Sequence, residues 1–445
     1  MILYKSDVKI IDSIDDVGRV FLWHNRVFRA INENKVIQVQ TLLSCGLIDE
    51  LVEKGFFPKT SIAKDIRLDG FDFLIEHDRI PYITVPSEWS FNMLKDACLA
   101  FLEIYKTCRK YGYILKDGHL FNLTFFKNQP IFFDFGSIVR ANSGNELYGL
   151  YISSIIPMLI WSKGDFYLAN LILRDDFSHD RFLPSISLAD HKVLQHIMPF
   201  SEKYPVRIIR RVINRFGRMF FKRNILAASS ISCEKLTKMI IMTKKRTAKT
   251  VWSNYHDELI HGIDINSNHR FDRIIEVISN LNLSSMVDLA GNKGCFSLLI
   301  AQKTNIKQIY CTDYDESAID SLYIFIKNNG IKKITPQLLN FICPIPNSSR
   351  QELKADIAVA LAVTHHAILT QSFNVDLVLR RIGDYSNRFV LVEFMPLGLW
   401  NGSQAPQIPD WYNVEWFREK FKEQFTLLKE EQTEPNRIFF LGEKN

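Results

Sequence analysis

The feature that most constrains the fold is a regular alternation of short apolar strands and helices in the second half of the chain. Beyond about residue 251, the segments SSMVDLA, QIYCTD, ADIAVALA and RFVLVEF are short and aliphatic, and helical stretches separate them. This pattern is typical of βαβ units, in which helices cover both faces of a parallel sheet. A last pair of strand-like segments, FTLLKEEQ and RIFFLGEK, flanks TEPN and predicts an antiparallel hairpin. We therefore expect an α/β domain over residues 251–445.

Polar segments follow the first two of these strands. The first strand runs into Asp288-Leu-Ala-Gly-Asn-Lys-Gly294, and the helical stretch CFSLLIAQK comes next. A turn of small residues between a strand and a helix lets the backbone approach a ligand and leaves helix amides free to bind polar groups. The second strand ends in Cys311-Thr-Asp313-Tyr-Asp315, where a carboxylate can accept hydrogen bonds from ribose hydroxyls. The pattern predicts a nucleoside site, and a nucleotide-binding fold with another ligand, or with none, is the alternative.

Size and composition indicate a globular protein of more than one domain. A chain of 445 residues predicts two or three domains, and 47% hydrophobic with 23% charged residues is a globular balance. The longest apolar stretch, GLYISSIIPMLIW at residues 149–161, is shorter than the about 20 residues of a bilayer span and predicts a buried helix. No secretory signal is expected from MILYKSDVKI. The seven cysteines contain no CxxC pair, which favours reduced thiols in a cytoplasm, without a zinc site.

The charge distribution divides the chain into three parts: residues 1–200, 201–250 and 251–445. Residues 201–250 contain 14 Lys and Arg against 2 Asp and Glu, a net charge of +12, so the formal total of +6 leaves −6 for the rest. This distribution does not favour a nucleic-acid-binding surface. Within the basic segment, residues 206–223 have helical spacing with a basic face. Such a helix can lie on an anionic membrane, but we favour a linker helix that packs its apolar side between two acidic domains.

A second set of polar residues lies in the first 200 residues. Asp117 and Asn122 are five residues apart in KDGHLFN, and Asp134 follows twelve residues later in DFG. The strand-like segments NLTFF and PIFFDF accompany these residues. This resembles the catalytic loop and the magnesium-binding DFG of protein-kinase-like phosphotransferases. The resemblance implies that Asp117 accepts the substrate hydroxyl proton, while Asn122 and Asp134 hold magnesium. No GxGxxG precedes it, and the strand expected to carry the phosphate-binding lysine offers only Arg29. We therefore expect a degenerate kinase-like α+β domain over residues 1–200.

The chain as a whole resembles a known family. The segments VDLAGNKGCFSLLIA, IYCTDYDESAI, ADIAVALAVTHHAI and VLVEFMP look like class I methyltransferases with a Rossmann-like domain, and most of all like the NoeA-like methyltransferases of surface-polysaccharide gene clusters. The upstream segments EHDRIPYITVPSEWSFNMLKDACL and LKDGHLFNLTFFKNQPIFFDFGSI resemble the same family. Enzymes that terminate O-antigen chains likewise join a methyltransferase to a kinase.

The resemblance implies S-adenosylmethionine as cofactor and assigns residues to it. Asp288, Gly291 and Gly294 would border the methionine, Asp313 would hold the ribose, and Tyr314 would lie on the adenine. The family usually has glycine where this chain has Ala290, before Asn292 of the turn, and an acid where it has Asn340. An asparagine carbonyl can still accept a hydrogen bond from the adenine amino group. The remaining candidates are Trp252 and Tyr255, which would close over the cofactor or pack in the core.

Three residues are candidates for the chemistry of methyl transfer. His365 and His366 follow the strand ADIAVALA, at the edge where ligands sit in such sheets. A neutral imidazole suits removal of a hydroxyl proton, although either histidine could instead pack in the core. Glu393, which ends VLVEF, is the other candidate, as a base or as an orienting partner.

These observations favour a cytoplasmic methyltransferase that modifies a sugar hydroxyl or a glycan-linked phosphate of a glycan or glycolipid. If the enzyme contacts the inner face of the cytoplasmic membrane, we expect the contact to be peripheral and to involve residues 206–223. One alternative is a bifunctional methyltransferase and kinase that uses ATP and magnesium, held by Asn122 and Asp134; no other metal is expected. The other alternative is an inactive scaffold in a glycan-assembly complex.

Overall fold

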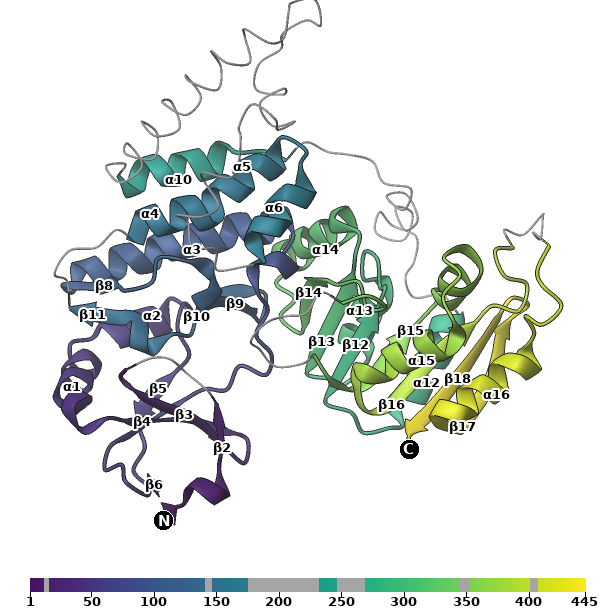
Figure 1. Ribbon diagram of the computed structural model, residues 1–445, viewed down its shortest axis with the longest axis horizontal. Coiled ribbons are helices and arrows are strands. Elements are labelled where there is room, and N and C mark those ends of the chain that lie inside the picture. The colour runs from purple at the N-terminus through teal and green to yellow at the C-terminus, as the bar shows by residue number, and fades with distance from the viewer. Residues whose placement is uncertain (12–15, 141–145, 175–231, 246–268, 345–352, 401–406) are drawn as a thin grey trace, which may run out of the picture. The chain divides into compact units, whose positions relative to one another are not determined.

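The computed structural model describes residues 1–11, 16–140, 146–174, 232–245, 269–344, 353–400 and 407–445 (Figure 1). The chain divides into two compact units. Unit 1 comprises residues 1–87 and 93–247, and unit 2 comprises residues 88–92 and 248–445. The predicted basic helix at residues 206–223 and the candidates Trp252 and Tyr255 lie outside the described residues.

Unit 1 begins with an antiparallel sheet whose described strands follow the order β2-β3-β4-β7-β5. The apolar segments RVFLWH, RVFRAI and DFLIEH contribute β3, β4 and β7. Their inward-facing residues, Phe21 and Phe28 among them, are fully buried. The strands of this part are β1 (Ile2–Leu3), β2 (Lys9–Ile11), β3 (Gly18–Trp23), β4 (Arg26–Ile31), β5 (Thr60–Ile62), β6 (Arg67–Leu68) and β7 (Leu74–His77).

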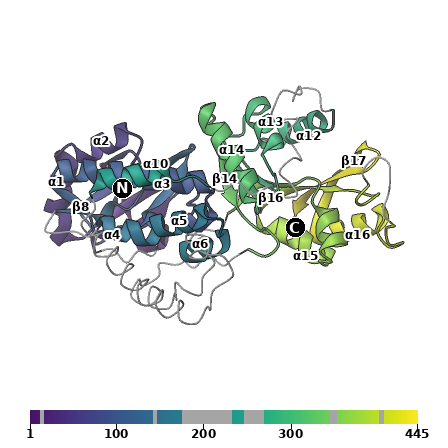
Figure 2. The same ribbon diagram turned by 90° about the horizontal axis from the view of Figure 1, so that it is seen from above.

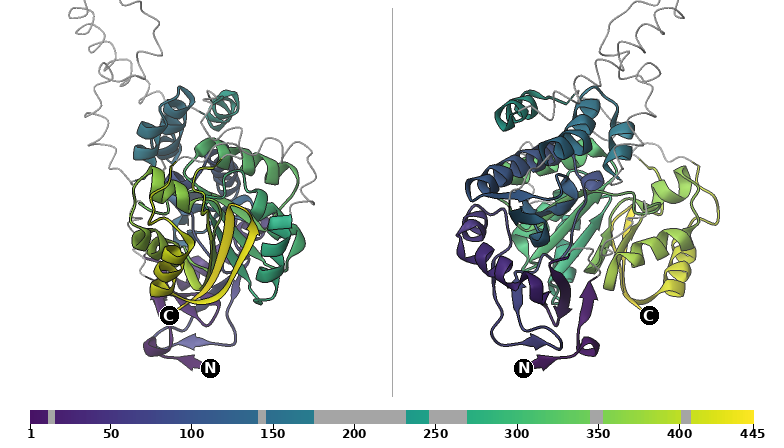
Figure 3. Two further views of the ribbon diagram at one scale, coloured as in Figure 1. Left: turned by 90° about the vertical axis from the view of Figure 1, so that its right-hand side faces the viewer. Right: turned by 60° about the vertical axis from the view of Figure 1, so that its left-hand side comes forward.

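The rest of unit 1 is mainly helical, and Figure 3 (right) shows the helices of residues 91–110, 146–173 and 233–242 as a layer apart from the N-terminal strands. Residues 146–162 form a continuous helical segment with one π-helical turn, which confirms the buried helix predicted there. None of the described helices combines the length and the apolar character needed to cross a bilayer. The helices are α1 (Val36–Ser44), α2 (Leu47–Glu53), α3 (Phe91–Lys110), α4 (Glu146–Leu150), α5 (Ile156–Ser162), α6 (Phe166–Leu173) and α10 (Cys233–Met242), and the strands are β8 (Tyr113–Leu115), β9 (Leu123–Phe126), β10 (Gln129–Phe132) and β11 (Ile138–Arg140).

Unit 2 is built on a sheet whose described strands follow the order β14-β13-β12-β15-β16-β18-β17. The first five strands in this order are parallel to one another, and β18 runs antiparallel to both of its neighbours, β16 and β17 (Figure 3, left). This is the Rossmann-like α/β arrangement predicted from the sequence, including the closing hairpin. The strands are β12 (Ser285–Leu289), β13 (Gln308–Asp313), β14 (Ile334–Leu338), β15 (Ala355–Ala360), β16 (Ser386–Phe394), β17 (Phe425–Glu434) and β18 (Arg437–Lys444).

Helices cover both faces of this sheet. Figure 2 shows α12, α13 and α14 on one face and α15 and α16 on the other. Aliphatic side chains of the first group and of the strands form one buried cluster that includes Ile274, Leu299, Leu322 and Ile357. Burial on both faces explains why the strands lack polar alternation. The helices are α12 (His269–Ser279), α13 (Cys295–Lys303), α14 (Glu316–Asn328), α15 (Val375–Asp384) and α16 (Val414–Gln424).

One strand of this sheet did not emerge from the sequence pattern. β14 reads ITPQL, and its Pro336 and Gln337 interrupt the apolar run that marks a buried strand. Proline is tolerated in β14 because this strand stands at the edge of the sheet. Only its pairing with β13 identifies it.

Candidate functional site

The glycine-containing turn after β12 lies directly against the end of β13. The Gly291 amide donates to the carbonyl oxygen of Thr312 at 2.9 Å, and the Asn292 amide donates to Oδ2 of Asp313 at 2.9 Å. A side chain at position 291 would place its Cβ 2.8 Å from the Asp288 carboxylate and from the Cys311 sulfur. Glycine is therefore required there by close approach. The two segments singled out in the sequence form one structural element.

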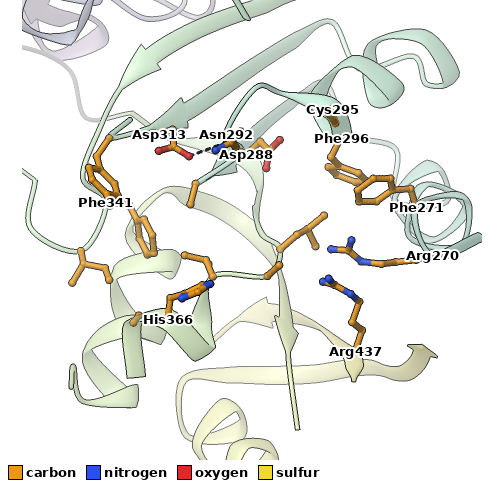
Figure 4. Close-up of a pocket in the computed structure, with 18 of the residues that line it drawn as sticks. Arg270, Phe271, Asp288, Asn292, Cys295, Phe296, Asp313, Phe341, His366 and Arg437 are labelled. Atoms are coloured by element: carbon orange, nitrogen blue, oxygen red, sulfur yellow. Dashed lines mark hydrogen bonds between the residues drawn. The ribbon is translucent and has the colours of Figure 1, made fainter. Parts of the chain in front are cut away.

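A cavity of about 360 Å³ opens over this turn, at the carboxyl ends of the parallel strands (Figure 4). Its volume lies within the usual range for small-molecule sites. Of the predicted site residues, the cavity is lined by Asp288, Ala290, Gly291, Asn292, Asp313, Tyr314 and His366. Further lining residues, which the sequence did not single out, include Arg270, Phe271, Phe296, Phe341, Ile342 and Arg437.

The backbone around the cavity is strained. Ala290, Asn292 and Ala362 all line the cavity, and their φ angles are 56°, 52° and 52°. This left-handed region is unfavourable for residues with a Cβ and is enriched at ligand sites. Ala290 is the position where the family usually has glycine, and the observed φ gives the physical reason for that preference.

Two carboxylates of the cavity are buried close to each other. Asp288 accepts from the Ser297 hydroxyl at 2.7 Å, and burial, reinforced by Asp313, raises its pKa to about 7. Burial also raises the pKa of Asp313 to about 6, against the opposing effect of the Asp315 and Asn292 amides. A carboxylate has about four acceptor positions, so Asp313 can accept bonds from a ligand in addition to these two amides.

The two adjacent histidines have different environments, although their rings are only 4.1 Å apart. His366 lines the cavity, and burial lowers its pKa. His365 is buried outside the cavity lining, and burial, with His366 and Arg437 nearby, lowers its pKa to about 3. Of the pair, only His366 is therefore positioned to meet a ligand in the cavity.

Glu393 does not have the environment of a general base. Its side chain is fully buried and accepts from Arg270 through Nε at 2.6 Å and Nη2 at 2.8 Å. Arg437 Nη1 donates to the same carboxylate at 2.9 Å. Guanidinium groups therefore occupy both carboxylate oxygens of Glu393. This environment fits the role of an orienting partner, which the sequence analysis considered, and does not support a role as general base. Glu393 orients the two arginines that line the cavity.

Two other predicted residues lie away from the cavity lining. The Oδ1 atom of Asn340 accepts from the amides of Ile342 at 3.2 Å and Cys343 at 3.1 Å, so the carbonyl expected to meet adenine holds its own loop instead. Gly294 caps the start of α13 with a φ of 74°. Gly294 therefore supplies the left-handed backbone conformation that joins the turn to α13.

In unit 1, the segments that carry the kinase-like motif come together. The amides of Lys116 and Asp117 donate to Ser137, just after the Asp134-Phe-Gly segment, at 2.7 and 3.2 Å. Burial raises the pKa of Asp134, with Arg29 opposing and Asp117 reinforcing this effect. Arg29, on β4, is itself buried, which lowers its pKa to about 10. The structure thus brings Arg29, Asp117 and Asp134 into one neighbourhood, while the kinase-like identity of this unit remains a prediction.

The buried carboxylate of Glu393 gives a test of how the site is held together. We expect Glu393→Gln to lower the free energy of unfolding of unit 2 by about 3–5 kcal/mol, because two largely buried guanidinium groups lose their shared anion. Glu443→Gln is the matched control, since its partner Arg388 is 65% exposed and such pairs contribute about 1 kcal/mol or less. Urea denaturation measures both. If Glu393→Gln lowered the free energy of unfolding as little as Glu443→Gln does, a structural role for the buried Glu393 carboxylate would be contradicted.

Comparisons with known proteins agree with the family resemblance. No model of a known protein family matches the chain. NoeA, a nodulation protein of Rhizobium meliloti (strain 1021), is 23% identical over 407 residues, which span 86% of this chain and 83% of NoeA.

Among solved structures, magnesium protoporphyrin IX methyltransferase (ChlM) from Synechocystis PCC 6803 with bound SAM is similar over 45% of this chain and 87% of that chain, with 12% identity and a TM-score of 0.32. WbdD in complex with a kinase inhibitor is similar over 40% of this chain and 41% of that chain, with 22% identity and a TM-score of 0.32. From the sequence comparison over most of its length, the chain is a homologue of the nodulation protein NoeA.

Proposed function

We propose that unit 2 is an S-adenosylmethionine-dependent methyltransferase that acts on an oxygen of a glycan or glycolipid. The contact between the glycine-containing turn and Asp313, at the edge of a Rossmann-like sheet, is the observation that carries this proposal. Ligands in such sheets bind beyond the carboxyl ends of the strands. The family resemblance supports methyl transfer over other reactions on the same fold.

The residues of the cavity fit the proposed cofactor. Asp313 has acceptor capacity for ribose hydroxyls, and the apolar side chains of Phe341 and Ile342, with Tyr314, offer surfaces for adenine. The close approach at Gly291 leaves the turn backbone open to the methionine portion. Asp288, when ionised, suits a neighbouring positive charge. The cofactor would supply an electrophilic methyl group on a sulfonium.

His366 is the residue we assign to the acceptor hydroxyl. Because burial lowers its pKa, the imidazole is neutral at physiological pH and can accept a proton. The protein mainly has to align donor and acceptor, so positioning accounts for much of the expected catalysis. A sugar hydroxyl would need this proton transfer, whereas a glycan-linked phosphate, the other acceptor class, is already ionised.

Replacement of the ribose-binding acid tests the proposal. Asp313→Ala should abolish measurable binding of S-adenosylhomocysteine, because two hydroxyls lose their acceptor. The matched control is Asp384→Ala, at the exposed end of α15, which should keep wild-type affinity. Isothermal titration calorimetry on the full chain measures both. Unchanged affinity of Asp313→Ala would refute the ribose assignment.

The raised pKa of Asp313 predicts a pH dependence of the same affinity. Binding to hydroxyls favours the ionised carboxylate, which predominates at pH 8 and falls to about a tenth at pH 5 for a pKa of about 6. We therefore expect S-adenosylhomocysteine to bind at least tenfold more weakly at pH 5 than at pH 8, because Asp288, with a pKa of about 7, is also protonated over this range. Calorimetry at the two pH values measures this change. An affinity that stays constant would contradict the assignment.

A second candidate function is nucleotide binding by unit 1. Asp134 lies within electrostatic range of Arg29 and Asp117, and Nδ2 of Asn122 is buried without a hydrogen-bond partner among the described residues. These residues occupy one neighbourhood in which magnesium and phosphate groups could be bound. The absence of a glycine-rich phosphate loop in the sequence still favours a degenerate unit.

Calorimetry with Mg-ATP on the full chain separates these alternatives. A bifunctional protein should bind Mg-ATP and lose at least tenfold in affinity on Asp134→Asn, because the metal would lose a carboxylate ligand. Asp72→Asn, at an exposed position of unit 1, is the control. A protein that binds S-adenosylhomocysteine but no Mg-ATP has only the methyltransferase site, and one that binds neither is a scaffold.

A further inference from the structure

The loop between β16 and α16 exposes several apolar side chains. Among its described residues, Trp411 is 50% exposed, Leu397 37% and Leu399 36%. A single exposed apolar residue is ordinary, but several of them in one loop mark a binding surface. None of the three lines the cavity, so neither the cofactor nor the reacting hydroxyl of the proposed function accounts for their exposure.

This loop packs against the segment that carries His366. A Cβ on Gly398 would lie 2.8 Å from the side chain of Leu369 and 2.9 Å from that of Ile408, so these three residues are in close contact. Leu369 lies on the π-helical turn that begins at His366, and Trp411 follows Ile408 by three residues. The loop therefore borders the side of the cavity on which we place the methyl acceptor.

An aromatic cluster holds Trp411 in place. Its ring makes a T-shaped contact with Trp416, with 4.9 Å between the ring centroids. The buried ring of Tyr412 packs against Trp416 at 5.8 Å and against Phe394, at the end of β16, at 4.9 Å. A ligand that stacks on the exposed part of Trp411 therefore meets a ring that is already positioned, and binding orders few side chains.

Charge and size restrict what this surface can bind. Residues 394–417 contain no Lys or Arg, whereas Asp410 and Glu415 are exposed. Anionic lipids and nucleic acids are bound through basic residues, so the loop does not favour them. A second copy of the chain is not favoured either. Half of one indole and about a third of two leucines fall far short of the about 800 Å² that each partner buries in a stable interface.

We infer that Trp411 is a stacking platform for an uncharged sugar ring of the glycan acceptor, outside the cavity in which the methyl group is transferred. One face of a pyranose ring presents mainly C–H groups and is similar in size to an indole, which offers a large apolar face with little conformational freedom. Hydroxyl groups at the edge of the sugar can donate to a carboxylate such as that of Asp410. The inference rests on the proposed function, because it takes the acceptor to be a glycan.

Titration of the full chain with neutral oligosaccharides tests the inference. The probes are maltohexaose, cellohexaose and mannohexaose, which differ in sugar or linkage and carry no charge. By calorimetry, at least one of them should bind the wild type, and Trp411→Ala and Trp411→Gln should each weaken that binding at least tenfold. Trp411→Phe should keep part of the affinity, because an aromatic face remains. Leu428→Ala, at an apolar position of unit 2 that is 47% exposed, should bind like the wild type.

Affinity for S-adenosylhomocysteine separates this inference from the proposed function. The Trp411 variants should bind it within twofold of the wild type, which also shows that they are folded. If the wild type binds S-adenosylhomocysteine but none of the oligosaccharides, or if the variants bind the oligosaccharides like the wild type, the inference is overturned and the proposed function stands. Failure of the wild type to bind S-adenosylhomocysteine overturns the proposed function, and with it the assignment of the sugar to a methyl acceptor.

Two measurements test the other occupants of the surface. Flotation with vesicles of phosphatidylcholine and phosphatidylglycerol tests a membrane, and sedimentation velocity tests a second copy of the chain. We expect Trp411→Ala to behave like the wild type in both. If the wild type floats with the vesicles or dimerises, and Trp411→Ala does not, the surface binds a membrane or another copy and the inference is overturned.

Discussion

The candidate site depends on the contact between the turn after β12 and the end of β13. Two backbone amides of the turn, those of Gly291 and Asn292, donate to the carbonyl oxygen of Thr312 and the carboxylate of Asp313. These bonds hold the turn close enough to β13 that only glycine fits at position 291. They also fix the Asp313 carboxylate before any ligand arrives, so a ligand does not have to order it. The rest of the cavity is arranged around this element.

The opposite side of the cavity is organised by a buried ion cluster instead of by a turn. Glu393 at the end of β16 joins Arg270 of α12 to Arg437 of β18. Thr364, in the segment after β15, donates to the Glu393 backbone carbonyl at 2.8 Å and ties that segment to the same strand end. Buried ion pairs contribute little net stability compared with apolar packing. Removal of one member of such a cluster, by contrast, leaves a buried charge without its partner.

The two units illustrate different relations between a motif and a site. In unit 2, the segments around Asp288 and Asp313 meet at the lining of one cavity of about 360 Å³. In unit 1, the segments around Asp117 and Asp134 also meet, through the bonds to Ser137. There, however, the buried cation beside Asp134 is Arg29, where the kinase resemblance implies a lysine. The guanidinium group of arginine is planar and larger than the ammonium group of lysine. The same arrangement of loops therefore does not imply phosphoryl transfer.

The sequence by itself determined the local helices and strands and the two carboxylates, Asp288 and Asp313, that line the cavity. Strands such as β13 and helices such as α13 follow from short apolar runs bounded by turn residues, and Asp313 follows from its place at a strand end. These are short-range properties, because hydrophobic pattern and turn chemistry act over a few residues.

Only the tertiary structure decided that Arg270 and Arg437 line the cavity and that Glu393 holds both of them. Arg270, Glu393 and Arg437 are far apart in the chain, and no spacing rule relates them. The sheet order brings β16 beside β18 and places α12 against them, and that pairing turned a candidate base into an anion held by two cations. Likewise, the Asn340 side-chain oxygen accepts hydrogen bonds from its own loop, which the sequence pattern did not indicate. Side-chain roles of this kind depend on which charges become neighbours after folding, and sequence separation does not encode that.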